Sequence, residues 1–596
     1  MNIVRDAPIG TWLRWTAFGR RVLPYREEVE GYQVPARYLQ GNNSSSSGAH
    51  SPAATLNGDP LSSNHKKSGK AEKPDRTPSK SKNSVDQNEK QAATGGKNGD
   101  VPNTQQGKEA GLEAGPAKSE NPADNALPPG VTLVDWDGDD DPEHPWNWSA
   151  PRHLLVAFTI LFLTFNVYGG SSIITSSFPG IQAKFGVGIV EVTVLLSLYV
   201  FAYGFGALVF SPLSEIPILG RNVFYIYPMI LFVALQAGTS TVETFYGLCI
   251  LRFLTGFMGA PCLATGAASL QDAFNPALLG PLISFWALAA FAAPSVAPTM
   301  GNYSAYYTKD WHWPMYILLI QIGITTMLLA FLPETSHSFI LLNRAKRLRK
   351  LTGNKNLMSQ AEIDQSHLTP NGIFLKAIVR PTEIFFKDPA ITYCHVYVAF
   401  IYGIYYLFFT SYPLVYNGIY KWSFPVEALG YLAFLIGGSL ACFIYLAYLT
   451  VKFGPIFKRG EQPLPEKWLD ATLVSTVLAP MGMFLFAWTA RSSVHWAVSL
   501  VGVAIFGGAN FVTIQCLFSY ILSVYPKYGA SLLAGNDFLR SSTAAGLLLA
   551  GEPMFKHMGI GGGNSFLGGL MILGTMGAYG IWFYGERLRS RSKFTS

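Results

Sequence analysis

The distribution of hydrophobic and polar residues divides the chain near residue 150. The residues before this point are mostly polar, whereas the remainder carries repeated apolar runs of about 20 residues, the length that crosses a bilayer as a helix. A polar and basic segment, residues 334–387, separates six such runs from six more. The pattern predicts an all-α membrane protein with twelve transmembrane helices, at residues 152–176, 191–211, 222–241, 246–273, 280–303, 313–333, 388–412, 426–452, 470–490, 495–523, 537–556 and 565–585.

The twelve predicted helices form two six-helix bundles, residues 151–333 and 388–586. Two bundles joined by a linker are typical of transporters whose halves rock around a central cavity at the membrane midplane. The chain has no GxxxxGK[ST] phosphate-binding loop, so ATP is not the expected source of energy. Neither a cofactor nor a metal is expected.

The charges predict how the chain crosses the membrane. Only 14% of the residues are charged, against about 25% in soluble proteins, and 44 basic residues exceed 37 acidic ones by 7. Five short connections carry one Lys or Arg each, but residues 334–387 carry nine, which predicts that this linker and both chain ends, 1–150 and 587–596, face the cytosol. The basic clusters flank apolar spans, so we expect them to anchor the protein to the membrane and not to bind nucleic acid.

The first 150 residues contain three different stretches. Residues 41–130 have no Phe, Trp or Tyr and are predicted to be disordered. Residues 8–24 mix Trp and Phe with Arg, which fits a short helix in the cytosolic leaflet or, equally, a loosely ordered tail. Residues 134–149, VDWDGDDDPEHPWNWS, lack the spacing of a calcium loop and read as an acidic turn leading to the membrane.

The stretch from Arg252 to Phe274 places an arginine inside an apolar span. Insertion of such an arginine into the membrane costs about 2.5–3.5 kcal/mol, so we expect it to have a hydrogen-bonding partner or a functional role. Asp272 lies about 30 Å further along the same helix and cannot pair with it. Pro261 interrupts the helix, and small residues recur at every fourth position and allow close helix packing: Gly256, Ala260, Ala264 and Ala268.

Two other classes of protein were weighed. A membrane-embedded enzyme would need a His or Asp constellation, but His395 is the only histidine well inside a predicted span and no acid lies near it in sequence. The five cysteines lie in apolar runs without a CxxC pair, which argues against a disulfide framework or a zinc site. A transporter-like sensor would carry a long structured tail, and the long tail here reads as disordered.

Seven segments in order resemble the twelve-span fungal drug:proton antiporters of the major facilitator superfamily, in particular the multidrug, benomyl and azole exporters. The resemblance covers residues 136–593. It implies proton-coupled efflux of hydrophobic or amphipathic small molecules by a monomer in the plasma membrane. The alternative is an exporter dedicated to one self-made metabolite. The segments are WDGDDDPEHPWNW, FSPLSEIPILGRN, LRFLTGFMGAPCLATGAASLQDAF, LPETSHSFILLNRAKRLRKLTGN, PLPEKWLDA, MFLFAWTA and AGNDFLRSS.

The resemblance implies roles for several charged residues. Arg252 corresponds to an arginine with a role in proton coupling, and the alternative is a structural arginine satisfied by helix carbonyls. Arg221 is expected to reach Asp272, and Glu215 the amino-terminal dipole of span eleven near Asn536. The expected gate, which would close the cytosolic side, consists of Glu215, Arg221, Asp272, Asp537 and Arg540. The alternative is that these are ordinary capping and interface charges.

The antiporter motif of span five is partly kept, as Ala293, Pro294, Ala297, Pro298 and Gly301. Its small residues at 293, 297 and 301 are expected to pack against the other bundle. In span seven this chain has Thr410 where the resemblance implies a carboxylate. Glu552, in span eleven, is the candidate to titrate in its place, unless it simply reaches the interface.

The expected substrate site is aromatic with a few polar groups. Tyrosine offers apolar area with a hydroxyl at its tip, which suits flat hydrophobic ligands. A lipid-facing or helix-packing stripe explains the span-seven residues equally well, and bonds between helices would also satisfy the polar groups. The candidates are Asn166, Tyr168, Tyr405, Phe409, Tyr412, Asn510 and Gln515.

Overall fold

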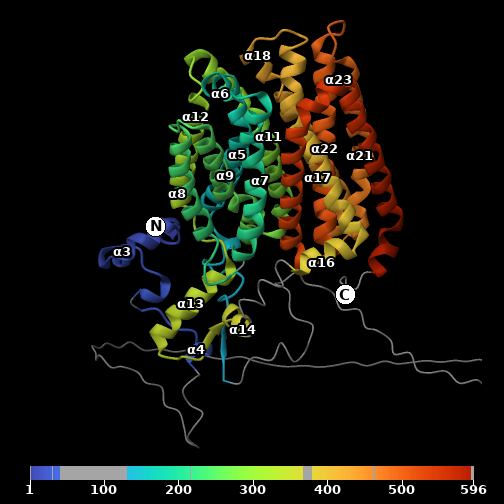
Figure 1. Ribbon diagram of the computed structural model, residues 1–596. Coiled ribbons are helices and arrows are strands. Elements are labelled where there is room, and N and C mark those ends of the chain that lie inside the picture. Colours follow the sequence, from blue (N-terminus) through green and yellow to red (C-terminus); the bar gives the residue numbers. More distant parts are fainter. Residues whose placement is uncertain are drawn as a thin grey trace, which may run out of the picture. The chain divides into compact units, whose positions relative to one another are not determined.

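The computed structural model describes residues 2–29, 31–39, 130–214, 216–366, 379–459, 461 and 463–591. These residues belong to one compact unit, which Figure 1 shows as two groups of long helices. The predicted disordered stretch 41–130, apart from Gly130, lies outside the described residues.

The first half contains the six expected spans. Pro261 divides the fourth span into two helices, as its missing N–H predicts. Pro294 and Pro298 are accommodated within the fifth. The helices of this half are α5 (Ala150–Ser172), α7 (Ile189–Ser214), α8 (Asn222–Thr239), α9 (Phe245–Gly259), α10 (Pro261–Ala273), α11 (Pro276–Thr308) and α12 (Trp313–Ala330), with the short η3 (Ile173–Ser177) and α6 (Phe178–Phe185) after α5.

The second half contains the other six expected spans. Eleven helices among the described residues are long and apolar enough to cross a membrane, and the last of them runs from Ser531 to Ser590. Gly559 breaks it with a positive φ of 70°, so it supplies two spans and the total is twelve. The helices are α17 (Pro389–Tyr412), α19 (Leu432–Lys452), α21 (Asp470–Thr489), α22 (Trp496–Val524) and α23 (Gly529–Arg591), with the short η5 (Pro413–Asn417) and α18 (Phe424–Leu429) between α17 and α19.

The two halves meet mainly where α7 packs along α23 and α11 along α19. Gly204 of α7 makes the first contact possible, since a Cβ there would lie 2.4 Å from Ser541 Cβ and 3.0 Å from the Asp537 carbonyl oxygen. A glycine is therefore required wherever these two helices approach this closely.

A small assembly caps one end of the first half, which we call the linker end. It contains α13 (His337–Thr352), followed by α14 (Gln360–Ser366), and the amino-terminal helices (Figure 1). The strand β1 (Thr132–Val134) pairs in parallel with β2 (Leu357–Ser359). The amino-terminal helices are α1 (Asn2–Arg5), α2 (Pro8–Leu13), α3 (Ala17–Val22), η1 (Arg26–Glu28) and α4 (Ala36–Leu39).

Arginines of α13 hold this assembly together. Arg344 pairs with Asp137 and, at 2.5 Å, with Asp141, and Arg347 contacts Glu143 at 2.9 Å. The expected role of this basic cluster in membrane anchoring is wrong for these two arginines, because they pair with carboxylates of the acidic turn. Residues 8–24 form α2 and α3 with a turn between them, and not one helix.

Candidate functional site

A cluster of hydroxyl groups joins the two halves deep within the membrane spans. The Tyr203 hydroxyl of α7 lies 2.5 Å from the Tyr402 hydroxyl of α17 and donates to the Tyr406 hydroxyl at 3.2 Å. The Ser171 hydroxyl of α5 lies 3.0 Å from that of Tyr406. All four side chains are buried, so this tyrosine cluster fills the boundary between the halves at this depth.

One ion pair lies beside the tyrosine cluster. Arg540 contacts Asp537 at 2.8 Å, donates to the Tyr168 hydroxyl at 2.7 Å, and lies 4.7 Å above the Tyr402 ring. Both charged residues are buried. A buried pair of this kind is costly to break, because removal of one partner leaves the other charge without compensation.

Asp537 and Arg540, which were expected at a gate on the cytosolic end, lie further along α23 than that expectation requires. They lie eight and eleven residues after Gly529, where α23 begins. At a rise of about 1.5 Å per residue, this places them about 12 Å and 17 Å along the helix. They belong to the boundary between the halves, where Arg540 contacts Tyr168 of α5 in the first half.

Arg252 is completely buried within the first half, with an exposed fraction of 0%. It donates to the carbonyl oxygens of Gly170 at 2.9 Å, Ser171 at 3.1 Å and Leu195 at 3.4 Å, and lies over the Tyr199 ring at 4.4 Å. Its Nη1 has no hydrogen-bond partner among the described residues. These carbonyl bonds match the structural alternative, yet Ser171 also connects the arginine to the tyrosine cluster.

The ion pair expected between α8 and α10 is present at the linker end. Arg221 Nε donates to Asp272 Oδ2 at 2.5 Å. Its role as a gate stays a prediction, and Glu215, the other expected member, lies outside the described residues.

Two residues that the sequence analysis did not assign complete this site. Glu334 accepts the backbone N–H groups of Arg221 and Asn222, both at 3.1 Å, and His337 Nε2 lies 2.8 Å from the Asp272 carbonyl oxygen. Burial raises the pKa of the Glu334 carboxyl, although the N–H donors oppose this, and burial lowers the pKa of His337. The sequence signal that could have identified them is the segment LPETSH, which places an acid and a histidine at the end of span six.

The small residues of the span-five motif pack within their own half, so the expectation that they face the other bundle is wrong. A Cβ on Gly169 of α5 would lie 3.3 Å from Ala297 Cβ and 3.6 Å from the Ala293 carbonyl oxygen, and one on Gly301 would meet Ser176 of η3. The opposite face of α11 reaches the other half through Ser295, whose hydroxyl lies 3.1 Å from that of Tyr405. Positions 293 and 295 differ by about 200° around a helix, so they face opposite directions.

All seven expected substrate residues are buried, and none is more than 7% exposed. The lipid-facing alternative is therefore wrong for the span-seven aromatics. Tyr405 donates to the Phe291 carbonyl oxygen at 2.9 Å, and Tyr412 stacks on Tyr431 with ring centroids 4.3 Å apart. Phe409 also stacks on Tyr431, at 5.1 Å. Helix packing thus accounts for these side chains in the conformation described.

The amide groups among these residues differ in how well they are satisfied. Asn166 donates to the Thr325 hydroxyl at 2.8 Å, but its Oδ1 has no partner among the described residues. Asn510 on α22 lacks a described partner for both its Oδ1 and its Nδ2. A buried polar group without partners costs about 1–3 kcal/mol, so Asn510 is the amide with most to gain from a bound molecule.

The acids within the second half have different surroundings. Glu552 pairs with Lys556 at 2.5 Å, and its other carboxylate oxygen is buried without a described partner. Its neighbour Gly551 lies beside Thr410, since a Cβ there would be 3.1 Å from the threonine hydroxyl. Glu427 of α18 is also buried, and the sequence analysis missed it although it follows a Pro near the start of span eight.

The described residues contain no group of three or more His, Cys, Asp or Glu side chains that could hold a metal ion. The ring nitrogens of His395 lie 2.8 Å from the Ile391 carbonyl oxygen and 3.0 Å from that of Leu532. This histidine therefore serves helix packing.

Twelve spans in two halves, with a polar boundary between them, are the architecture of a membrane transporter. The family model of the Major Facilitator Superfamily matches residues 160–547, and the chain belongs to this superfamily, whose members are transporters and not enzymes. A solved structure of the proton:xylose symporter XylE is similar to it with a TM-score of 0.55 and 12% identity, over 73% of this chain and 96% of that one.

Fungal relatives are more similar in sequence. The MFS-type transporter pyvG of Aspergillus violaceofuscus is 38% identical over 78% of this chain and 86% of its own. The fluconazole resistance protein 1 of Saccharomyces cerevisiae is 36% identical over 78% of this chain and 85% of its own. Other relatives bear the names of multidrug transporters and of a biosynthesis-cluster transporter.

Proposed function

We propose that the protein exports hydrophobic or amphipathic small molecules, azole-like drugs among them, across the plasma membrane in exchange for protons. The observation that carries this proposal is the pair of Asp537 and Arg540, which is buried between the halves and bonded across their boundary to Tyr168. The relationship to a fluconazole resistance protein supports the substrate class.

Proton exchange would act through this pair. Protonation of Asp537 removes the charge that balances Arg540, and the guanidinium, which stays charged near neutrality, then needs another partner. Because Arg540 also holds Tyr168, a change at this pair alters the contact between the halves. One proton crossing 100 mV supplies about 2.3 kcal/mol to drive such a cycle.

Arg252 would have a positioning role in this scheme. Its bonds to the carbonyl oxygens of Gly170 and Ser171 hold the outer part of α5, from which Ser171 reaches the tyrosine cluster. Glu552 remains a second candidate for proton exchange, because one of its carboxylate oxygens is buried and unpaired among the described residues.

The proposed substrate site is the aromatic boundary region, which would open as the halves separate. In the conformation described it is closed, since Tyr405, Phe409 and Tyr412 are packed. Opening would expose these rings together with Asn510, and a flat apolar ligand would replace the lost ring contacts.

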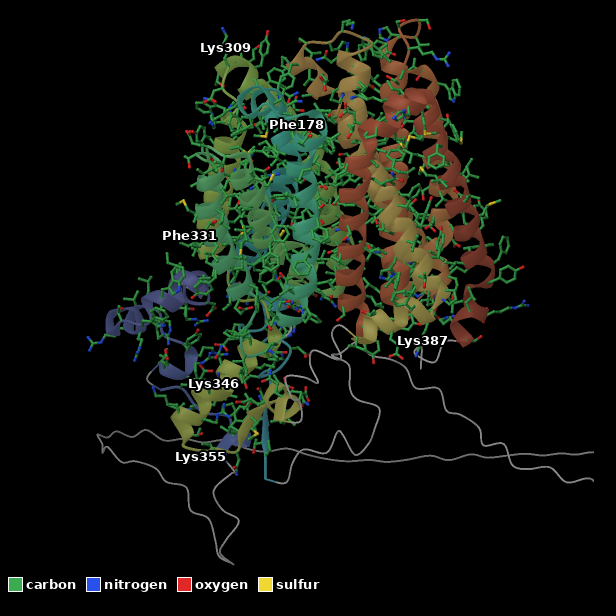
Figure 2. The ribbon with its side chains drawn as sticks, in the orientation of Figure 1. Phe178, Lys309, Phe331, Lys346, Lys355 and Lys387 are labelled. Atoms are coloured by element: carbon green, nitrogen blue, oxygen red, sulfur yellow. The ribbon has the colours of Figure 1, made fainter. Side chains whose placement is uncertain are left out.

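The distribution of lysines supports a cytosolic linker end. Lys346 and Lys355 lie at that end, Lys387 lies on the same side of the second half, and Lys309 lies at the opposite end of the first half (Figure 2). By the positive-inside rule, both chain termini would then face the cytosol.

The experiment is efflux of a fluorescent azole from proteoliposomes with and without an imposed pH gradient. We expect the wild type to depend on the gradient, and Asp537→Asn to lose that dependence while it still binds substrate. Asp310→Asn is the control, because this partly exposed carboxylate pairs with His312 in the short connection between α11 and α12. Gradient-dependent transport by Asp537→Asn would overturn the role of this pair.

A dedicated metabolite exporter is the competing function. Expression in a drug-sensitive yeast separates the two, because a multidrug exporter protects against several unrelated compounds. Protection against a single compound would favour the dedicated exporter.

A further inference from the structure

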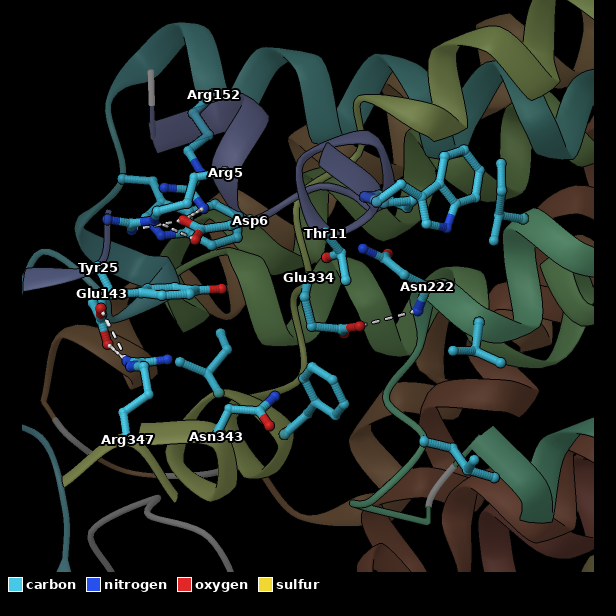
Figure 3. Close-up of a pocket in the computed structure, with 18 of the residues that line it drawn as sticks. Arg5, Asp6, Thr11, Tyr25, Glu143, Arg152, Asn222, Glu334, Asn343 and Arg347 are labelled. Carbon is cyan, nitrogen blue, oxygen red and sulfur yellow. Dashed lines mark hydrogen bonds and ion pairs between the residues drawn. The ribbon is translucent and has the colours of Figure 1, made fainter. Parts of the chain in front are cut away.

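A cavity of about 160 Å³ lies at the linker end, outside the boundary between the halves. The amino-terminal helices form one wall, the start of α8 a second, and α13 a third (Figure 3). Nothing in the proposed transport cycle uses this cavity, which we call the linker-end pocket.

The three carboxylates that line the pocket are already occupied. Asp6 accepts Arg5 at 2.7 and 3.0 Å and Arg152 at 2.9 Å, while Glu143 accepts Arg347 at 2.9 and 3.2 Å. Glu334 accepts four backbone N–H groups, those of Arg221, Asn222, Thr335 and Ser336. None of the three therefore has a strong need for a further cation.

Hydrogen-bond donors, by contrast, remain in excess. Arg5 and Arg152 both pair with the single carboxylate of Asp6, at 2.7 and 2.9 Å. Arg152 is buried and its Nε has no described partner, and the same holds for the indole Nε1 of Trp148, over whose ring Arg152 lies at 3.7 Å. Asn222 Oδ1 is a buried lining acceptor without a described partner, and it suits a hydroxyl or an amino group.

An apolar path leads from the pocket along α8. Val223 and Tyr227 line the pocket and are exposed, and Ile230 and Leu231 continue the exposed face one turn further into the membrane span. Residues spaced by three or four lie on one face of a helix, so this strip has the dimensions and chemistry of an acyl-chain contact.

We propose that the linker-end pocket binds an anionic phospholipid of the adjacent leaflet, with its phosphate at Arg5 and Arg152 and an acyl chain along Val223 and Tyr227. The phosphate supplies the acceptor that Arg152 Nε and Trp148 Nε1 lack, and the headgroup hydroxyl or amine reaches Asn222. If the linker end is cytosolic, as proposed above, the pocket faces the leaflet that carries most anionic lipid.

This site has a direct connection to the expected gate. Asn222 follows Arg221, and both donate backbone N–H groups to Glu334, while Arg221 holds Asp272. A lipid that fixes Asn222 therefore favours the conformation in which the Arg221–Asp272 pair is formed.

The test measures lipid binding to the full chain and needs no transport. Purified protein in nanodiscs is titrated with phosphatidylserine in a phosphatidylcholine background, and thermal stability is followed. We expect saturable stabilisation by phosphatidylserine, and about tenfold or more weaker apparent affinity in Arg5→Gln, as the loss of one charged hydrogen bond implies.

Arg21→Gln is the matched control, since Arg21 is exposed and does not line the pocket. Val223→Asp is a second variant that blocks the acyl path and leaves the arginines intact, and it should also weaken binding. Equal stabilisation of wild type and Arg5→Gln, or equal effects of phosphatidylserine and phosphatidylcholine, would overturn the proposal. Inorganic phosphate that produces the full stabilisation would also overturn it, because the ligand would then be a free anion.

Discussion

The Nη2 of Arg540 donates to the hydroxyl of Tyr168 at 2.7 Å, and the two residues belong to opposite halves of the protein. Because Arg540 also pairs with Asp537, this bond connects the charge state of one half to the position of the other. Any movement that separates the halves at this depth has to break it.

Tyr168→Phe removes this connection and leaves the ring in place. A hydrogen bond to a charged group is worth about 1.5–3 kcal/mol, so we expect the rate of gradient-driven efflux to change about tenfold or more. Tyr246→Phe, at an exposed position, is the control. An unchanged rate would mean that the bond does not limit the cycle.

A charge exchange tests the gate pair. Arg221→Asp and Asp272→Arg should each reduce transport, because each single change replaces the ion pair with two like charges that repel each other. The double variant should recover a substantial part of the activity, measured as efflux in the same vesicles. Failure of the double variant would contradict direct pairing.

Arg344→Ala should release the linker-end assembly. Its guanidinium is buried and pairs with the buried carboxylates of Asp141 and Glu27, so its removal leaves buried negative charge poorly compensated, at a cost of about 3–5 kcal/mol. Hydrogen exchange of residues 2–39 should become markedly faster. Lys346→Ala, at a neighbouring exposed position on α13, should leave that exchange unchanged.

The same assembly should loosen in acid. Burial, and then the neighbouring His337, lower the pKa of His144 to about 4, whereas Asp141 and Asp135 oppose the shift. The unfolded histidine binds its proton near pH 6.5, so between pH 6.5 and about 4 the unfolded state holds more protons and stability falls as the pH falls. Hydrogen exchange of residues 132–148 at pH 7 and pH 5 measures this, and His144→Gln should reduce the difference. If hydrogen exchange in His144→Gln depends on pH as strongly as in the wild type, another group causes the pH dependence.

Gly204→Ala tests the close approach of the halves. The added methyl would lie 2.4 Å from Ser541 Cβ, so α7 and α23 have to move apart, at a cost of about 1–3 kcal/mol. The melting temperature should fall and transport should weaken. Gly546→Ala, on α23 with open space at its Cβ, is the control and should have little effect on either.

The spans could be predicted from the sequence because each is a local property, a run of apolar residues of sufficient length. Pro261 likewise marks the division of the fourth span without any knowledge of its neighbours. The pairing of Arg221 with Asp272 was expected from a resemblance, and its two residues lie at span ends where the chain geometry leaves few other partners.

The remainder of the site could not be predicted because it depends on which helix faces lie together. The small residues at 293, 297 and 301 form a regular stripe, but a stripe does not say whether α5 or the other half lies against it. The contacts of Arg344 join segments about 200 residues apart, and no local pattern distinguishes such a partner from a lipid headgroup.

The parallel pairing of Thr132–Val134 with Leu357–Ser359 has a mechanical consequence. This strand pair holds the first part of the linker against the segment that precedes α5. The last part of the linker, α16 (Arg380–Lys387), packs instead on α17 and α23. A fluorophore on Lys355 would therefore travel with the first bundle and one on Lys387 with the second. The distance between these two labels would report any movement of one bundle against the other, without a label inside the membrane.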